Sequence, residues 1–417
     1  MTRHYSAFSL LREGITGQKG WEPAWRSPEP KPRYDVIIIG AGGHGLATAY
    51  YLAKNHGITD VAVIEKGWLG GGNTGRNTTV IRSNYFYPES VALYDLALRL
   101  YEGLSKDLNY NIMLSQRGML NLVHFPADME MAARLTNAMQ INGVDAELLD
   151  RDQVRAMLPI YNYGPDARYP VAGGVLQPRG GIARHDAVAW GYARAASRAG
   201  VDIIQQCEVE DFIIEGGRCR GVRTSRGAIR ADRVGMAVAG HSSVMAAKAG
   251  FSLPLISYAL QACVSEPVKP VLDCTVIAPG PATYASQSDK GELVVGGALD
   301  RIPSYGQRGN LPVLQNVVAG LIEMFPAFRQ LKLMRQWAGI VDVAPDSSPI
   351  IGESPLPGLF LNCGWGTGGF KAIPAGGTLL AHLLATGEHH DISRPFDLDR
   401  FATGRLIDEA AGSGIAH

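Results

Sequence analysis

The chain has 417 residues, with 39 Lys and Arg against 39 Asp and Glu, so its formal net charge at pH 7 is zero. This balance gives no electrostatic argument for nucleic acid or an anionic membrane as a partner, and the length allows two domains with a large core. No apolar run is long enough to span a membrane, no secretory signal is visible, and the 5 cysteines are scattered without a C-x-x-C pair. We therefore expect reduced thiols, a cytoplasmic protein and no metal site.

The first 33 residues precede any predicted strand. They contain Trp21 and Trp25, and four prolines occur between residues 23 and 32. This composition predicts an extended arm outside the core. The tryptophans favour contact with a partner subunit.

Residues 34–45, YDVIIIGAGGHG, begin with a β-branched run that is typical of a buried parallel strand. Gly40, Gly42 and Gly45 follow at the G-x-G-x-x-G spacing, and residues 46–54 have helical character. The first glycine permits a tight turn, the second lets the backbone approach a pyrophosphate, and the third lets helix and strand pack closely. The helix N-terminus then offers free N–H groups to the phosphates.

A second predicted strand, at residues 61–64, ends in Glu65, about twenty residues after the glycines. A carboxylate at this position accepts the hydroxyls of a ribose and argues against a 2′-phosphate. The unit predicts a dinucleotide site but does not separate FAD from NAD.

The middle of the chain alternates between predicted helices and strands. Residues 66–87 are rich in Gly and Asn, so their backbone can wrap closely around a ligand. Helices are predicted at 91–108, 151–158, 187–199 and 243–250. Extended segments are predicted at 119–123, 146–149, 171–177, 201–204, 208–215, 220–225, 229–234 and 235–239.

Between residues 253 and 334 the pattern changes to short alternating strands, at 261–264, 284–287 and 292–296, with one helix at 313–324. This pattern is typical of an antiparallel sheet. Tyr284, Gln287 and Trp337 are candidates for the lining of a substrate cavity, although such side chains in strands are usually core.

Residues 358–386, GLFLNCGWGTGGFKAIPAGGTLLAHLLAT, repeat the strand–glycine–helix order far from the first unit. Two such units favour FAD over NAD, because a flavin cofactor is long enough to need contacts from both ends of the chain. We predict an α/β (α+β) fold, with a Rossmann-like FAD-binding domain of the glutathione-reductase type and an inserted antiparallel-sheet substrate domain. The predicted divisions are an N-terminal arm (1–33), the FAD-binding domain (34–115, 170–252, 335–390), the substrate domain (116–169, 253–334) and a C-terminal tail (391–417).

The segments YDVIIIGAGGHG, VAVIEKG, NTTVIRSNY and GWGTGGFKAIPAGG together resemble the D-amino acid oxidase and sarcosine oxidase clan of FAD enzymes. Within this clan the chain resembles the β subunits of heterotetrameric sarcosine oxidases, over residues 34–410. QPRGGIARHDAVAWGYARAA and NCGWGTGGFKA are the most discriminating segments, because generic FAD enzymes lack both.

The resemblance implies two flavins. The residues that it implies for cofactor binding are Gly40, Gly42, Gly43, His44, Gly45, Glu65, Asn73, Thr74, Asn77, Thr78, His185, Val209, Gly240, Gly366, Gly369 and Lys371. FMN is implied at the contact with a large α subunit, attached through its 8α-methyl group to His185, with Asp186 available to orient the imidazole. Residues 73–82 would run near both flavins. FAD should be non-covalent, because no cysteine occurs in residues 337–345, where monomeric relatives attach it.

The implied reaction is the oxidative demethylation of sarcosine. Arg82 and Lys371 are the implied catalytic residues, and they would bind the substrate carboxylate. FAD would oxidise the amine, FMN would take the electrons, and O2 would be reduced to H2O2 at FMN. The product would be glycine, with formaldehyde or methylene-tetrahydrofolate formed with tetrahydrofolate in a complex that also contains small γ and δ subunits. Residues 292–297 lack the oxygen-activating lysine of monomeric relatives, in keeping with oxygen chemistry away from FAD.

Structural roles compete with each of these assignments. His185 could instead be a histidine at a helix start whose ring bonds a backbone carbonyl. Lys371 could be a solvated surface lysine, and Arg82 could belong to an internal salt bridge. Two other functions also remain open. One is a single-flavin dehydrogenase for dimethylglycine or a D-amino acid. The other is a flavin-binding scaffold whose catalysis lies in a partner.

Overall fold

The computed structural model describes residues 6–19 and 23–409. Its first layer is a six-stranded sheet in the order β18-β19-β12-β1-β2-β8. The five parallel strands are β1 (Val36–Ile39), β2 (Val61–Ile64), β8 (Asp202–Ile204), β12 (Arg233–Met236) and β19 (Leu359–Cys363). The antiparallel edge strand is β18 (Ile350–Glu353). Because β1 and β19 are separated only by β12, both ends of the chain contribute to one sheet.

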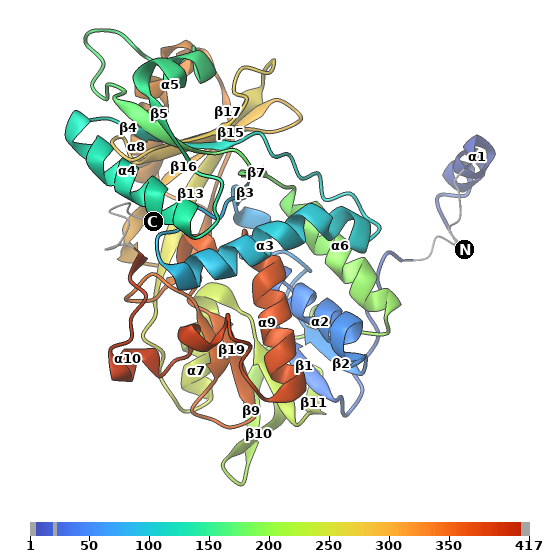
Figure 1. The fold of residues 1–417 in the computed structure, drawn as a ribbon. Helices are drawn as coiled ribbons and strands as arrows, with labels where there is room; N and C mark the ends of the chain where they lie inside the picture. Colours follow the sequence, from blue (N-terminus) through green and yellow to red (C-terminus); the bar gives the residue numbers. More distant parts are fainter. Residues whose placement is uncertain (1–5, 20–22, 410–417) are drawn as a thin grey trace.

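Both faces of the six-stranded sheet are covered, which explains the continuous apolar run in β1. Val36 and Ile38 face one hydrophobic cluster, and Ile37 and Ile39 face another. The first face packs on helices α2 (Gly43–His56), α6 (His185–Arg198) and α9 (Ile373–Thr386), and α3 (Pro88–Asp107) crosses the outer side of α9, as Figure 1 shows. The second face packs on α7 (Ser242–Lys248) and on the small sheet of β9 (Val209–Glu215), β10 (Arg218–Thr224) and β11 (Gly227–Arg230).

The second layer is an eight-stranded sheet in the order β17-β13-β16-β15-β14-β4-β6-β5. All of its pairings are antiparallel except that of β14 with β4. Its strands are β4 (Met119–Val123), β5 (Glu147–Asp150), β6 (Gly173–Gln177), β13 (Ile256–Pro267), β14 (Thr275–Ala278), β15 (Thr283–Gln287), β16 (Glu292–Pro303) and β17 (Leu333–Val343). Helices α4 (Pro126–Ile141), α5 (Arg151–Met157) and α8 (Leu311–Met324) accompany it at the top of Figure 1. The two layers confirm the predicted fold class.

The sheets divide the chain slightly differently from the predicted domains. Strands β6 and β17 belong to the eight-stranded sheet, although residues 170–252 and 335–390 are predicted for the FAD-binding domain. We therefore propose that residues 173–177 and 333–343 be grouped with the substrate domain.

The N-terminal arm is not extended throughout, because residues Ala7–Ile15 form helix α1. Ser6 caps it by accepting a hydrogen bond from the N–H of Ser9 (3.1 Å), and the prolines begin only after the helix. None of its residues is buried, and Figure 1 shows it standing away from the main body. Trp25 packs against a hydrophobic cluster of its own chain, whereas Trp21 lies outside the described residues.

The C-terminal segment, as far as residue 409, packs onto the body. Helix α10 (Arg400–Thr403) contains Arg400, whose guanidinium is completely buried beside Asp346, with Nε and Oδ2 2.7 Å apart. Residues 410–417 of the predicted tail lie outside the described residues. None of the helices in the described part combines the length and apolar character needed to cross a lipid bilayer.

Candidate active site

A cavity of about 1100 Å³ opens where the two sheets meet. This volume exceeds the roughly 300–1000 Å³ that is usual for small-ligand pockets, so a dinucleotide fits. Its walls come from the loop between β1 and α2, from residues 64–82 and 237–245, from the eight-stranded sheet and from the turn before α9. Of the predicted cofactor residues, those that line it are Gly40, Gly42, Gly43, His44, Glu65, Asn73, Thr74, Asn77, Thr78, Val209, Gly240, Gly366, Gly369 and Lys371.

The glycines of the first loop divide into structural and ligand-facing positions. Gly40 has a φ of 102°, and a Cβ there would lie 2.5 Å from the carbonyl oxygen of Ala237. A Cβ on Gly45 would lie 1.9 Å from the carbonyl oxygen of Gly40, so strand and helix could not approach as they do. At Gly42 the contact would be only the hydroxyl of Thr74, at 3.2 Å. Gly42 and the N-terminus of α2 therefore present bare backbone to the cavity, as a pyrophosphate requires.

Glu65 follows β2 at one end of the cavity. Its Oε2 accepts a hydrogen bond from the N–H of Ala41 (3.0 Å), and its Oε1 accepts one from the N–H of Gly67 (2.9 Å). These bonds fix the carboxylate at the carboxyl edge of the sheet, beside Val209 from β9. The arrangement fits a ribose whose hydroxyls donate to the carboxylate.

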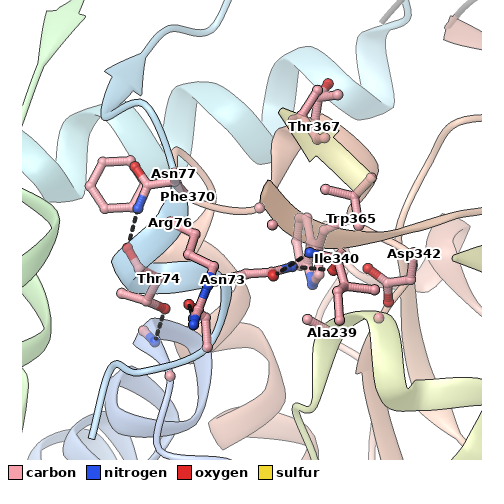
Figure 2. A pocket seen from close by; sticks show the side chains of 18 of the residues that line it. Asn73, Thr74, Arg76, Asn77, Ala239, Ile340, Asp342, Trp365, Thr367 and Phe370 are labelled. Carbon is pink, nitrogen blue, oxygen red and sulfur yellow. Dashed lines mark hydrogen bonds between the residues drawn. The ribbon is translucent and has the colours of Figure 1, made fainter. Parts of the chain in front are cut away.

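Residues 73–82 join the two layers around the cavity. Thr74 accepts a hydrogen bond from the N–H of Gly43 (2.9 Å), which ties η1 (Asn73–Arg76) to the start of α2. Asn73 bonds both backbone groups of Ile340 in β17, accepting from its N–H at 2.8 Å, and Figure 2 shows these bonds crossing the pocket wall. Thr78 bonds the hydroxyl of Tyr284 at 3.0 Å. The segment therefore shapes the cavity through side chains that already make hydrogen bonds within the chain.

Of the three candidates for the substrate cavity, only Tyr284 lines it. Gln287 instead holds nearby backbone, accepting from the N–H groups of Val271 (2.9 Å) and Leu272 (3.1 Å). Trp337 donates to the carbonyl of Arg76 at 2.6 Å.

His44 connects the two glycine turns. Its Nε2 lies 2.8 Å from the carbonyl oxygen of Gly369, so this nitrogen carries the proton and donates. Burial lowers the pKa of His44 to about 4, and the ring packs 4.6 Å from the ring of Trp365. A neutral imidazole whose N–H already donates to a carbonyl has no further donor for a phosphate. We therefore propose that His44 positions the second glycine turn.

Lys371 lies at the other end of the cavity and is only 5% exposed, so it is not a solvated surface lysine. Its Nζ donates to the carbonyl of Thr367 (3.3 Å) and lies 5.8 Å from the ring centre of Tyr85. Burial holds the pKa of Lys371 well below its ordinary value, and the charge of Arg82 lowers it further.

Arg82 meets Lys371 over a pair of stacked tyrosines. The guanidinium lies 4.9 Å from the ring centre of Tyr85 and donates to the side-chain oxygen of Asn84 at 2.7 Å. The rings of Tyr85 and Tyr94 are parallel within 7°, with centres 3.8 Å apart. Two basic side chains from opposite parts of the sequence thus share one buried platform at the cavity wall.

Two buried acidic residues of the cavity have no assigned role in the sequence analysis. Asp342 of β17 accepts from the N–H of Gly364 at 2.7 Å, and burial raises its pKa to about 6. Glu409 accepts from the backbone N–H groups of Phe86 (3.1 Å) and Tyr87 (2.9 Å). A lone charge within the apolar run WAGIVDVAP is the signal that could have revealed Asp342. Glu409 has no comparable sequence signal.

His185 is the first residue of α6 and does not belong to the cavity lining. Burial lowers its pKa, so the ring is neutral near pH 7, and in the described part of the chain it makes no hydrogen bond. The expectation that Asp186 orients it is wrong. Asp186 instead pairs with Arg184 (Nε to Oδ1, 3.0 Å) and accepts from the N–H of Ala187 (2.8 Å).

A short ribbon links the cavity wall to His185. Strand β3 (Val80–Ile81), within the cavity-lining segment, pairs with β7 (Gly181–Ile182). The N–H of Ala183 also donates to the carbonyl of Thr79 (3.1 Å). Residues 73–82 therefore contact both the cavity and the chain that leads into α6. Across residues 6–19 and 23–409, no group of three His, Cys, Asp or Glu side chains is arranged to hold a metal ion.

Comparisons with known proteins agree with this geometry. The DAO family model, described as FAD dependent oxidoreductase, matches residues 35–383. The chain is 54% identical to the sarcosine oxidase subunit beta of Rhodobacter capsulatus over 100% of both chains. It is 53% identical to the sarcosine oxidase subunit beta of an Arthrobacter species, over 94% of this chain and 97% of that relative.

Solved structures share the fold. L-proline dehydrogenase from P. horikoshii matches with a TM-score of 0.84 at 25% identity, covering 90% of this chain and 100% of that one. Glycine oxidase from Geobacillus kaustophilus matches with a TM-score of 0.80 at 23% identity, covering 89% and 99%. The glycine-lined cavity, the family model and the full-length relatives lead to one conclusion: the chain belongs to the DAO family of FAD-dependent oxidoreductases, in the group of sarcosine oxidase β subunits.

Proposed function

We propose that this chain is the β subunit of a multi-subunit sarcosine oxidase and that it oxidises sarcosine at a non-covalent FAD. The observation that carries the proposal is the pair of Arg82 and Lys371, buried together at the cavity wall. Two basic groups on an aromatic platform suit a small carboxylate better than a neutral amine. The overall reaction is sarcosine, O2 and water giving glycine, formaldehyde and H2O2.

The cavity fits FAD along its length. Glu65 would hold the ribose, Gly42 and Gly43 the pyrophosphate, and Gly366 and Gly369 would approach the isoalloxazine. FAD, when bound, supplies the acceptor for the two electrons and the hydrogen that leave the N-methyl group. The protein has to hold the carboxylate, exclude water, and place the methyl group over the reactive part of the cofactor.

The proposal includes FMN attached to His185, at a contact with a large α subunit, where O2 would be reduced to H2O2. The ring of His185 is neutral and free of hydrogen bonds within the described residues, which suits a nucleophile towards the 8α-methyl group. The β3–β7 ribbon supports a short connection between the two flavin sites. Small γ and δ subunits and tetrahydrofolate, which would accept the one-carbon unit, complete the proposed assembly. We place it in the cytoplasm, where five unpaired cysteines stay reduced.

The test is to co-express the chain with its partner subunits, precipitate the complex with acid, and digest the pellet. A yellow peptide that carries FMN on His185, with FAD released to the supernatant, is the expected result. Flavin found only in the supernatant would overturn the His185 attachment and favour a single-flavin dehydrogenase for dimethylglycine or a D-amino acid. The variant His185→Ala serves as the matched control, since it should lose the peptide-bound flavin and keep FAD.

A further inference from the structure

The amine of Lys371 is buried without a counter-charge. Its side chain is 5% exposed, and its only hydrogen bond in the described part of the chain goes to the neutral carbonyl oxygen of Thr367, at 3.3 Å. A protonated lysine in such a place loses its hydration and gains no carboxylate partner.

The groups that face Lys371 from the surrounding elements do not supply the negative charge that a protonated amine would need. Arg82 contributes a second positive charge, and Tyr85 and Tyr94 of α3 are neutral phenols. His44 of α2 is neutral at pH 7. Glu409 is also on this side, where its charge interacts with Arg82 and its oxygens accept hydrogen bonds from the backbone N–H groups of Phe86 and Tyr87. The pKa of Lys371 is accordingly depressed by burial and by Arg82, and both effects favour the neutral amine in the free site.

A bound amino acid would favour the protonated form of Lys371, because it would bring a carboxylate to Arg82 and Lys371. An anion within hydrogen-bond reach restores the charged form of a lysine. The free amino acid also carries an ammonium group, which has no lone pair and cannot stabilise the iminium that forms when the neighbouring C–H bond breaks. The site therefore needs one proton at Lys371 and must remove one proton from the substrate.

We propose that Lys371 accepts the ammonium proton of the bound substrate, so that the step which charges the carboxylate site also produces the reactive free amine. One N–H bond of the substrate breaks and one forms on Nζ, the total charge is unchanged, and no electrons move. This inference rests on the proposed function, since it requires the carboxylate of an amino acid at Arg82 and Lys371.

The decisive experiment measures protons taken up on binding. The probe is (methylthio)acetate, the thioether counterpart of sarcosine, which has the carboxylate but no ionisable nitrogen. Titration calorimetry of the FAD-loaded complex at pH 8, in buffers of different ionisation enthalpy, should show about one proton taken up per site. The affinity for the probe should also fall about tenfold per pH unit above the pKa of Lys371, a measurement that needs no variant.

The variant Lys371→Arg separates binding from proton transfer, because a guanidinium is always charged. It should bind the probe with almost no proton uptake, whereas Lys106→Arg, on the exposed end of α3, should behave like the wild type. Wild-type binding without proton uptake would overturn the inference and leave the carboxylate site intact. Failure of the wild type to bind the probe, or unchanged binding in Arg82→Met, would overturn the proposed function as well.

Discussion

The site contains two basic side chains, Arg82 and Lys371, at the wall of the cavity. Lys371 and Arg82 come from segments almost 290 residues apart, yet both reach the ring of Tyr85. Removing either side chain takes away one of the two groups proposed to bind the substrate carboxylate. Single residues at this site should therefore control catalysis more strongly than cofactor content.

Replacing Arg82 or Lys371 with Met should slow the reduction of FAD by sarcosine about 100- to 1000-fold, because a buried charge–carboxylate contact contributes several kcal/mol. Flavin content should stay near the wild-type value. Anaerobic stopped-flow absorbance measures the rate, and Arg99→Met, an exposed arginine of α3, is the control. Unchanged reduction rates would favour a scaffold subunit whose catalysis lies in a partner.

Asp342 should make the protein less stable as the pH rises from about 4 to 6. Its pKa in the folded protein is about 6 against an ordinary 3.8, so the native state keeps a proton that the unfolded chain has already released. The difference corresponds to about 3 kcal/mol.

The variant Asp342→Asn has no carboxyl group to titrate at this position, so this loss of stability with rising pH should not occur. Its melting temperature minus that of the wild type should therefore rise between about pH 4 and 6 and then level off. Ser348→Ala, outside the cavity lining, controls for general loss of packing. A difference in melting temperature that does not change with pH would contradict the assignment.

At the scale of elements, the glycine loop and the strands around it were predictable because their signals are local. Strand β1, the glycine spacing and Glu65 lie within about thirty residues and are required by one turn geometry. Strands β13 and β16 run much further than their local patterns predict, and β17 was not predicted as a strand, because long-range pairing with β13 defines both partners. Helix α1 was missed because the prolines that follow it dominate the composition of the arm.

Gly45→Ala should prevent the correct packing of β1 against α2, since its Cβ would lie 1.9 Å from the carbonyl oxygen of Gly40. We expect loss of bound FAD and a destabilisation of about 3 kcal/mol or more. Gly103→Ala in α3, where a Cβ meets nothing within 4 Å, should instead stabilise the protein by about 0.5–1 kcal/mol. Flavin absorbance and thermal unfolding measure both effects, and an FAD-replete Gly45→Ala protein would contradict this account of the loop.

At the scale of the whole molecule, the site is assembled from residues that only the tertiary fold brings together. The sequence motifs identify Glu65, Arg82 and Lys371, but the stacked pair of Tyr85 and Tyr94 depends on where α3 crosses α9. The contacts of Glu409 are also invisible in the sequence, because no local pattern connects residue 409 with residues 86 and 87.

The C-terminal segment is held by one buried ion pair. Arg400 and Asp346 are both fully buried, and the guanidinium also donates to the carbonyls of Phe396 (3.1 Å) and Ser348 (2.8 Å). Arg400→Met should lower the free energy of unfolding by about 3–5 kcal/mol, because it leaves an unpaired buried carboxylate. Urea unfolding of Arg400→Met, Asp346→Asn and the double variant should show a double loss well below the sum of the singles, and additive losses would refute the coupling.

The order of strands in the six-stranded sheet also has a consequence for protein synthesis. Strand β19 pairs with β12, which pairs with β1, yet 320 residues separate the end of β1 from the start of β19. A ribosome adding 5–20 residues per second needs roughly 15–65 s to make that stretch. During this interval the nascent chain carries β1, and after residue 236 also β12, without β19, and the turn that bears Lys371 does not yet exist. We therefore expect FAD to bind late in the synthesis of the chain. Chains released before about residue 371 should leave the ribosome without a complete flavin site.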